Sequence, residues 1–285
     1  MRQSFPTGLA LGTANDGSES VTLPCETTDR ARFKVKASDN IFFDVNDSDL
    51  EVVNDPPQIA MDPVADGEVD DQCEFTLNFS ATVTDACSID AGDVDVSLTK
   101  EAPGAFTLGA PNISIVQNGV GQVDVSGDVL VSDLLSSPAV VRIGIDAEDS
   151  CGTTSSDFRL VEVSDTTPPS IAVSLSQDTL WPPNHKLAQI TANVVASDNC
   201  PGVSFELASV TSDEPDNGIA DGDTTGDIQN ADIGTPDLMF ELRAERAGNL
   251  DGRTYTAVYE ATDGSDNTAS DSDEVEVPLN QAGME

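Results

Sequence analysis

Basic residues are scarce in this sequence. It has 12 Lys and Arg residues against 52 Asp and Glu residues, which gives a formal net charge of −40 at pH 7. Phosphate binding needs a basic face, and an anionic membrane surface repels so acidic a chain. The composition therefore excludes nucleic acid as a natural partner. It favours a medium rich in divalent cations, or high salt that screens the repulsion between carboxylates.

The residue types on which most catalytic sites depend are also rare. The chain has one His (His185), one Trp (Trp181) and two Tyr. A Ser-His-Asp or Cys-His mechanism would have to use His185, and no nucleophile motif accompanies it. Paired carboxylates for glycoside hydrolysis are available, but the aromatic platforms of a sugar-cleaving cleft are not. We therefore predict that the protein is not an enzyme.

Long apolar runs are missing as well. No stretch approaches the ~20 apolar residues that a membrane-spanning helix needs. Residues 1–10 lack the apolar centre of an export signal. We predict no membrane insertion and expect this chain to be a piece of a longer secreted polypeptide.

The sequence does contain short apolar runs divided by turn residues. In Phe240–Ala244 and Tyr255–Ala261, apolar and polar residues alternate with the period of two that half-buried β-strands have. The 21 Gly and 16 Pro residues fall mostly between such runs. This pattern predicts an all-β chain of short strands joined by turns.

Three sequence markers recur at intervals of about 110 residues. One marker contains Asp39, Asp149 and Asp263, separated by 110 and 114 positions. A second contains Cys87 and then Cys200, 113 positions later. The third is a paired proline that closes one unit and opens the next. Because an immunoglobulin-type sandwich has ~100 residues, the markers predict tandem immunoglobulin-like β-sandwich modules in series.

The markers also give the boundaries of the modules. Residues 1–55 would hold the closing part of a preceding module, residues 56–167 and 168–279 would each form a full module, and residues 280–285 would be a tail. The paired prolines at the joints restrict the conformations of each hinge. We therefore expect the modules to follow one another as a rod.

The last module carries several longer motifs. They are Leu180-Trp-Pro-Pro-Asn-His-Lys186, Val210-Thr-Ser-Asp-Glu-Pro-Asp-Asn-Gly218, Asp221-Gly-Asp-Thr224, Leu242-Arg-Ala-Glu-Arg246 and Gly252-Arg-Thr-Tyr-Thr256. With these motifs the chain resembles the hyalin-repeat-like and related immunoglobulin-like modules of bacterial surface proteins. The resemblance covers nearly all of residues 168–279 and is weaker over residues 56–167. It implies a non-catalytic part of a large secreted or surface-attached protein.

The repeat register suggests a pairing for the cysteines. Cys87 and Cys200 occupy the same position in successive modules, and Cys151 aligns with Ser265. We predict a Cys87–Cys151 disulfide, which would stabilise the fold by roughly 4 kcal/mol in the chain-entropy model. Cys200 would then be a buried free thiol.

Two cysteines are left over by this register argument. Cys25 and Cys73 could form a bridge of their own, although no repeat position supports it. No pair has the CxxC spacing and the chain has one His, so a zinc site is not expected.

Oxygen-rich loops indicate calcium at two places. The first is an acidic loop in which Gly residues would let several oxygen ligands converge, although it lacks the order of an EF-hand loop. Its candidate ligands are Asp216, Asn217, Asp221, Asp223 and Asp227. The alternative is a solvated acidic loop without a bound ion.

The second place is the joint between modules, where Asp149, Asp165 and Asp198 fall in repeating markers. Calcium there would stiffen the array, by analogy with cadherin-like stalks. The alternative is that these are turn aspartates that cap their own backbone. Their counterparts at the preceding joint are Asp39, Asp55 and Asp85.

Trp181 allows a second function. It could be the platform of a carbohydrate-binding module, but a Trp that folds over the end of the sandwich beside Pro182 and Pro183 is the simpler interpretation.

Arg243, Arg246 and Arg253 allow a local basic patch. We expect them instead to pair with neighbouring acids such as Asp213 or Glu214, because guanidinium groups satisfy carboxylates two at a time.

These observations predict a non-catalytic structural or adhesive segment of an extracellular or cell-surface bacterial protein. It would be stabilised by calcium and would space or present other domains. Its expected partners are neighbouring modules of a longer chain and, on its surface, a glycan or protein ligand.

Overall fold

The computed structural model describes residues 5, 7–14, 16–38, 41–101, 105–218, 222 and 224–280. Its regular elements are twenty β-strands and one short 3-10 turn, η1 (Ala91–Asp93). The prediction of an all-β chain is confirmed. No helix in the described part of the chain is long and apolar enough to cross a bilayer.

Sandwich 1 is built from the strands between residues 58 and 164. One sheet has the strand order β10-β11-β7-β5, with β9 added beside β11, and the other has the order β6-β13-β12-β8. All pairs are antiparallel except β6 with β13. The strands are β5 (Gln58–Met61), β6 (Gly67–Glu68), β7 (Glu74–Thr84), β8 (Val94–Glu101), β9 (Thr107–Leu108), β10 (Asn112–Gln117), β11 (Gln122–Ser132), β12 (Ala139–Glu148) and β13 (Thr154–Ser164).

The core of sandwich 1 follows from alternation along its long strands. Successive side chains of a strand point to opposite faces, so every second residue can face the other sheet. Leu77 in β7, Val129 in β11 and Ile143 in β12 are fully buried in this way. Val and Ile dominate these positions because branched side chains pack well on a pleated surface.

Sandwich 2 has its own core and two sheets, ordered β14-β15-β18-β17 and β16-β19-β20. Strand β19 buries every second residue, including Tyr255 and Tyr259, as its sequence pattern predicts. The strands are β14 (Ser170–Leu175), β15 (Leu187–Ser197), β16 (Ser204–Ser212), β17 (Ile228–Gln229), β18 (Met239–Arg243), β19 (Gly252–Thr262) and β20 (Thr268–Pro278).

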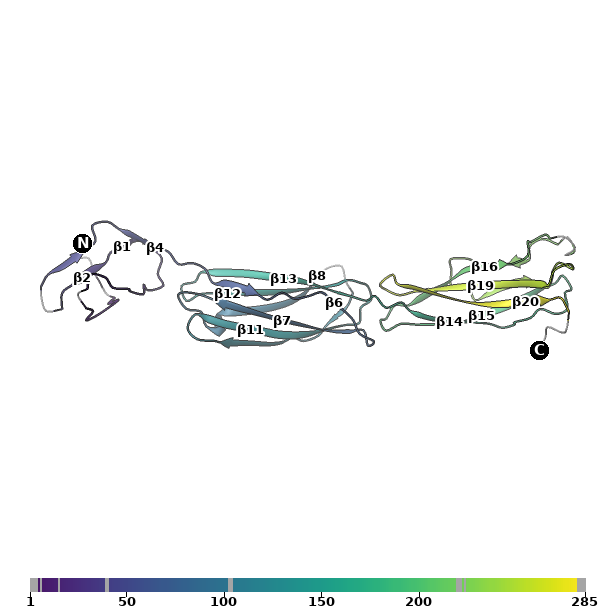
Figure 1. The fold of residues 1–285 in the computed structure, drawn as a ribbon, viewed down its shortest axis with the longest axis horizontal. Coiled ribbons are helices and arrows are strands. Elements are labelled where there is room, and N and C mark those ends of the chain that lie inside the picture. The colour runs from purple at the N-terminus through teal and green to yellow at the C-terminus, as the bar shows by residue number, and fades with distance from the viewer. Residues whose placement is uncertain are drawn as a thin grey trace.

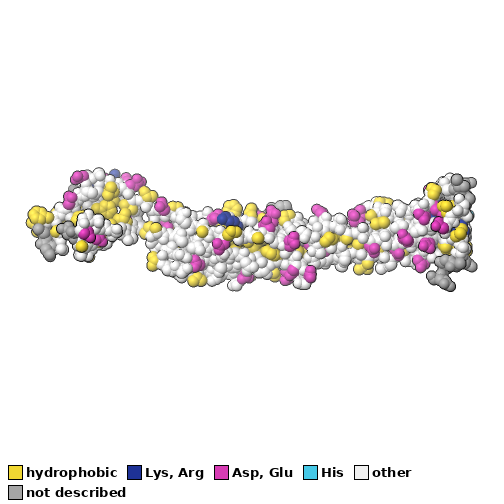
Figure 2. Space-filling view, in the orientation of Figure 1, with side chains coloured by type: hydrophobic (Ala, Val, Ile, Leu, Met, Phe, Trp, Pro, Cys, Tyr) yellow, Lys and Arg dark blue, Asp and Glu magenta, His cyan; other side chains and the backbone are white. Residues whose placement is uncertain are grey.

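The N-terminal segment, up to residue 55, has only two small sheets among its described residues. Strand β1 (Thr28–Ala31) pairs with β4 (Leu50–Val52), and β2 (Lys34–Lys36) pairs with β3 (Phe43–Val45). Several of its large apolar side chains stay exposed, among them Phe42 and Phe43. Apolar side chains, drawn in yellow, gather over this end of the molecule in Figure 2.

The three units follow one another along the long axis of the molecule (Figure 1). Strands run nearly parallel to that axis, so the loops gather at the ends of each sandwich. The first joint, between the N-terminal segment and sandwich 1, includes the loops 85–90 and 149–153. The second joint, between the sandwiches, includes the loops 69–73, 133–138, 165–169, 198–203 and 263–267.

Disulfides and a candidate cation site at the joints

Each joint is crossed by a disulfide. Cys25 of the N-terminal segment is bonded to Cys87 of sandwich 1, and Cys73 of sandwich 1 is bonded to Cys200 of sandwich 2. The Cα–Cα distances are 5.4 Å and 4.9 Å, within the usual range for a disulfide. Covalent links therefore join each unit to the next.

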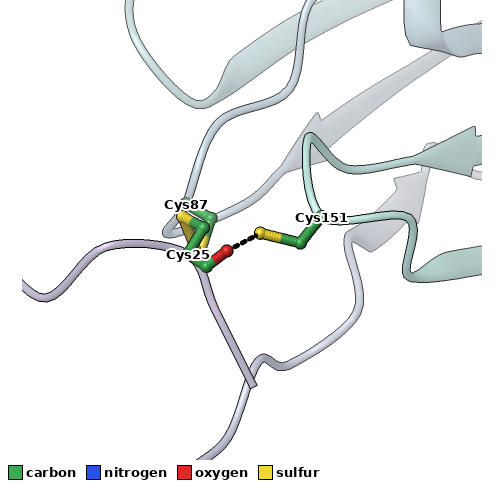
Figure 3. Close-up of side chains that lie close together, drawn as sticks. All are labelled: Cys25, Cys87 and Cys151. Carbon is green, nitrogen blue, oxygen red and sulfur yellow. Dashed lines mark hydrogen bonds between the residues drawn. A yellow bond between two sulfur atoms is a disulfide. The ribbon is translucent and has the colours of Figure 1, made fainter. Parts of the chain in front are cut away.

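The predicted pairing was wrong. Cys87 is not bonded to Cys151, which is an exposed free thiol, and Cys200 is not free. Nor do Cys25 and Cys73 bond to each other. The repeat register compares loops within a module, whereas each bond joins loops that meet only when one unit docks on the next. Cys151 still lies beside Cys25 and Cys87, with all three sulfur atoms within 4.8 Å of one another (Figure 3).

Asp149 lies at the first joint, in the hairpin between β12 and β13. Its Oδ1 accepts hydrogen bonds from the backbone N–H groups of Cys151 (2.9 Å) and Thr153 (2.8 Å), and Oδ2 accepts one from Asn54. Burial opposes ionisation of this carboxyl, but these hydrogen bonds outweigh it and hold the pKa of Asp149 below its usual range. Asp149 caps its own loop and ties it to Asn54.

The predicted joint set therefore divides between the two joints. Asp149 precedes β13 and Asp165 follows it, so they lie at opposite ends of sandwich 1. Asp165 and Asp198 do come together at the second joint, where Asp263 from the β19–β20 hairpin joins them in place of Asp149.

The second joint is closely packed. Asn199 of sandwich 2 donates a hydrogen bond to the backbone oxygen of Asp70 in sandwich 1 (2.9 Å), and Asn267 donates one to that of Asp165 (3.1 Å). Gly264 approaches the carbonyl of Leu135 so closely that a Cβ at this position would collide with it. The loops of the two sandwiches thus meet directly.

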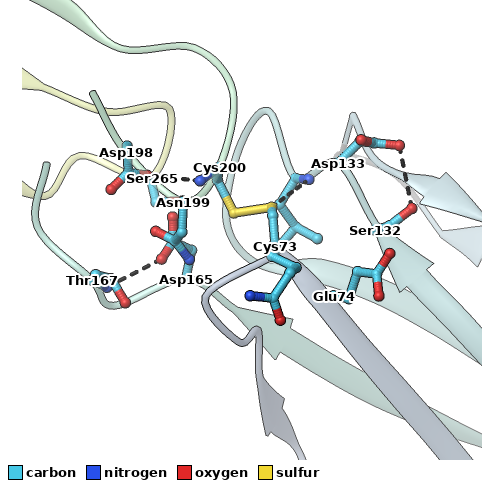
Figure 4. The surroundings of a disulfide bond; sticks show 12 residues. Cys73, Glu74, Ser132, Asp133, Asp165, Thr167, Asp198, Asn199, Cys200 and Ser265 are labelled. Atoms are coloured by element: carbon cyan, nitrogen blue, oxygen red, sulfur yellow. Dashed lines mark hydrogen bonds between the residues drawn. A yellow bond between two sulfur atoms is a disulfide. The ribbon is translucent and has the colours of Figure 1, made fainter. Parts of the chain in front are cut away.

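Asp165 is the most deeply buried of the acids that meet here, with 3% of its surface exposed. Its Oδ1 accepts the backbone N–H of Thr167 (3.1 Å), while Oδ2 is buried without a hydrogen-bond partner of normal geometry. Asp198 is arranged in the same way: one oxygen accepts the N–H of Cys200 (3.0 Å), and Oδ1 is buried without a partner (Figure 4).

The electrostatics of this site are unfavourable without a cation. Burial raises the pKa of Asp165, and the nearby charges of Asp198 and Asp263 raise it further, against the lowering effects of Thr167 and Asn199. Within the described part of the chain, no Lys or Arg forms an ion pair with Asp165, Asp198 or Asp263. Like charges therefore meet here without a compensating cationic side chain.

The atoms present fit a hard cation. Buried polar atoms in proteins nearly always have a partner, so a group of unpartnered oxygens needs an explanation. Carboxylate oxygens of Asp165 and Asp198 lie within 4.8 Å of each other, and Ca²⁺ binds oxygen at about 2.3–2.6 Å, so one ion can reach both. The neighbouring sulfur of Cys200 is held in a disulfide and offers no thiolate. The unpartnered oxygens are Asp165 Oδ2, Asp198 Oδ1, Asn199 Oδ1 and Ser265 Oγ.

Sequence reasoning named two of these residues and missed the others. Asp165 and Asp198 were candidate ligands, whereas Asn199 and Ser265 were not. Asn199 directly precedes Cys200 of one recurring marker, and Ser265 lies two positions after Asp263 of another. Asp263 also belongs to such a marker, and its carboxylate accepts hydrogen bonds from the N–H groups of Ser265 and Asn267 (both 2.8 Å). Asn199, Ser265 and Asp263 all lie in segments that recur along the chain, and this recurrence is the sequence signal that could have identified them.

The acidic loop differs from its prediction. Asp216 accepts the backbone N–H groups of Gly226 and Asp227, and these hydrogen bonds lower its pKa. Asn217 is exposed. Asp227 points into the sandwich, where Arg243 Nε (3.2 Å) and Arg253 bind its two oxygens, so its carboxylate is already neutralised by ion pairs. The two remaining candidates, Asp221 and Asp223, lie outside the described residues.

The charged residues of the motifs form a buried ionic cluster at the far end of sandwich 2. Arg253 pairs with Glu214 (3.2 Å), which confirms that this Arg is matched by a neighbouring acid. His185 is bound through Nδ1 to the fully buried Glu245 (2.9 Å). Arg246 donates hydrogen bonds to two backbone oxygens at the end of β20. The cluster closes the end of the sandwich, and it gives His185 a structural partner.

Trp181 is half-buried at the same end of sandwich 2, joined to Pro182 by a cis peptide bond. The roles weighed for Trp181, a cover over the sandwich end and a carbohydrate platform, both stay predictions.

No protein-family model matches this chain, and no curated protein matches it either. Solved structures do match. The cis-dimer of protocadherin gamma B7 repeats EC3–6 is 16% identical with a TM-score of 0.30, over 85% of this chain and 55% of that one. Protocadherin gamma C5 EC1–3 is 11% identical with a TM-score of 0.31, over 89% and 78%. The fibronectin(III)-like modules of Clostridium thermocellum CbhA are 16% identical with a TM-score of 0.25, over 80% and 97%.

This chain spans 55% and 52% of two protocadherin chains that it matches. Matches with TM-scores of 0.25–0.31 carry no conclusion about fold, activity or ligands. The resemblance to hyalin-repeat-like modules has no support from a family match and stays a prediction.

Proposed function

We propose that this chain is a non-catalytic structural segment of an extracellular protein, in which β-sandwiches in series space or present neighbouring domains. Two disulfides cross the joints, and disulfides of this kind persist in oxidising, extracellular environments. The motifs of the last module further support a bacterial surface protein. Neighbouring modules of the same polypeptide are the partners that this role requires.

We propose further that calcium stiffens the second joint. The observation that carries this is the set of buried, unpartnered oxygens contributed by Asp165 at the end of sandwich 1 and by Asp198 and Asn199 of sandwich 2. Bound calcium would supply the positive charge that this cluster of acids lacks. Because the ligands come from both sandwiches, they would tie the two units together in addition to the Cys73–Cys200 disulfide.

Thermal unfolding tests the calcium proposal. Calcium at about millimolar concentration should raise the melting temperature of the native chain, because a ligand of the folded state stabilises it by mass action. Sodium chloride at the same ionic strength is the control for screening. Asp165→Asn combined with Asp198→Asn should remove the calcium-specific part of the rise.

Asp55→Asn is the matched control variant, because Asp55 is the repeat counterpart of Asp165 and is exposed. It should keep the full calcium response. If sodium and calcium act alike, or if the double variant still responds as the native chain does, calcium does not bind at this joint.

A further inference from the structure

The first joint holds a free thiol directly beside its disulfide. The sulfur atoms of Cys25, Cys87 and Cys151 all lie within 4.8 Å of one another. Cys25 and Cys87 are bonded, and the thiol of Cys151 donates to the backbone oxygen of Cys25 (Figure 3). Cys151 is exposed, and Cys25 and Cys87 are half-buried, so a solvent base can reach the thiol.

The loops that carry Cys87 and Cys151 are held together by their own hydrogen bonds. Ser150 N donates to Ser88 O (3.2 Å), and the hydroxyl oxygens of the same two residues lie 3.0 Å apart. Each cysteine N–H also binds the aspartate two residues before it, Cys87 to Asp85 (2.6 Å) and Cys151 to Asp149 (2.9 Å). Cys151 is therefore kept close to Cys87 independently of the N-terminal segment.

The second joint lacks this arrangement. Cys73 and Cys200 are 2% and 3% exposed, and Ser265 occupies the register position of Cys151. Among the described residues the free thiol is that of Cys151, which lies at the first joint and not beside this disulfide. One joint thus has an exchange partner for its disulfide and the other does not.

We propose that Cys87 exchanges its disulfide partner between Cys25 and Cys151. The thiolate of Cys151 attacks Sγ of Cys87, a Cys87–Cys151 bond forms as the Cys25–Cys87 bond breaks, and Cys25 leaves as a thiolate. It then takes up the proton that Cys151 released. The exchange consumes no oxidant or reductant, because one disulfide replaces another.

The two forms differ in how the first joint is held. With the Cys25–Cys87 bond, the N-terminal segment is covalently fixed to the end of sandwich 1. With the Cys87–Cys151 bond, two loops of sandwich 1 are joined to each other, and the segment is held by the connecting chain and by hydrogen bonds such as those from Asn54 to Asp149 and Thr153. The exchange would loosen the first joint while the second stays locked, and it does not depend on calcium.

Trapping of free thiols tests the exchange. The native chain is incubated without reductant at several pH values, quenched in acid, alkylated with N-ethylmaleimide and mapped as peptides. The adduct should be divided between Cys151 and Cys25. The rate at which the adduct reaches its final distribution between the two cysteines should rise about tenfold per pH unit below the thiol pKa, because the thiolate is the nucleophile.

Two variants complete the test. Cys151→Ser should give no adduct at Cys25, since the attacking thiol is gone. Cys25→Ser, oxidised with glutathione disulfide, should form the Cys87–Cys151 bond. The proposal is overturned if Cys25 of the native chain stays unlabelled, if Cys87 and Cys151 remain free in Cys25→Ser, or if Cys73 and Cys200 are labelled as readily as Cys25.

Discussion

At the scale of single residues, aspartates at equivalent repeat positions share a role at one position and differ at another. Asp149 and Asp263 both accept the N–H groups that close their hairpins. Asp55 is exposed, whereas its counterpart Asp165 is buried with one oxygen unpartnered. The two residues differ in burial because loops of sandwich 2 pack against Asp165, as the hydrogen bond from Asn267 to its backbone oxygen shows. A sequence shows the spacing of such residues but not their burial, so it named Asp165 and Asp198 and placed Asp149 with them wrongly.

The raised pKa of Asp165 predicts a pH dependence of stability. A carboxyl whose pKa is higher in the folded state does not lower folding stability while it is protonated in both states. That holds below its ordinary pKa of 3.8. The cost appears as the pH rises through the folded-state pKa, because ionisation is then harder in the folded chain. Asp165→Asn should therefore stabilise the calcium-free protein at pH 7 and have little effect on its stability near pH 3.5.

Denaturant unfolding in the presence of a chelator, at several pH values between those limits, measures this difference. Comparing the variant with the native chain cancels the opposite contribution of Asp149, whose lowered pKa makes it lose stability in acid. A variant less stable than the native chain at pH 7 would show that Asp165 is compensated by something other than a cation.

At the scale of elements, the long strands could be predicted and the contacts between units could not. The alternation in Tyr255–Ala261 matches the burial pattern of β19, because the residues of a two-sheet sandwich must alternate to fill one core. The two-residue strands β6, β9 and β17 have no such pattern. The partners of Cys87 and Cys200 are set by docking between units, which no period within a module encodes. Asp227 was misassigned for a similar reason, since its arginine partners come from β18 and β19.

The Cys73–Cys200 disulfide should hold the loops of the second joint. Leu134 N donates to Cys73 Sγ (3.3 Å), so the sulfur also positions the loop 133–138. Cys200→Ser should destabilise the protein by up to about 5 kcal/mol, because the closed loop is long. It should also speed amide hydrogen exchange in residues 69–73 and 198–203, the two loops that the bond joins.

Cys151→Ser is the matched control, since it also removes a cysteine sulfur but at the first joint. It should leave amide hydrogen exchange in residues 69–73 and 198–203 unchanged. Equal exchange rates in the native chain and in Cys200→Ser would mean that packing alone holds this joint.

At the scale of the whole molecule, charge and connectivity favour an extended shape. The units succeed one another along one axis, and each joint is made of loops from facing ends and a disulfide (Figure 1). A net charge of −40 opposes folding back of one sandwich on another, because that would bring their acidic faces together. Such a shape fits the proposed function, which is the spacing of neighbouring domains.

Small-angle X-ray scattering of the oxidised chain in calcium tests this account most directly. A compact globular protein of this length would have a radius of gyration of about 19 Å. The account predicts a rod-like profile with a radius of gyration at least about one and a half times that value, since three units in line lie far from their common centre. A radius near the compact value, with a symmetric distance distribution, would show that the units pack side by side and would contradict the spacer function.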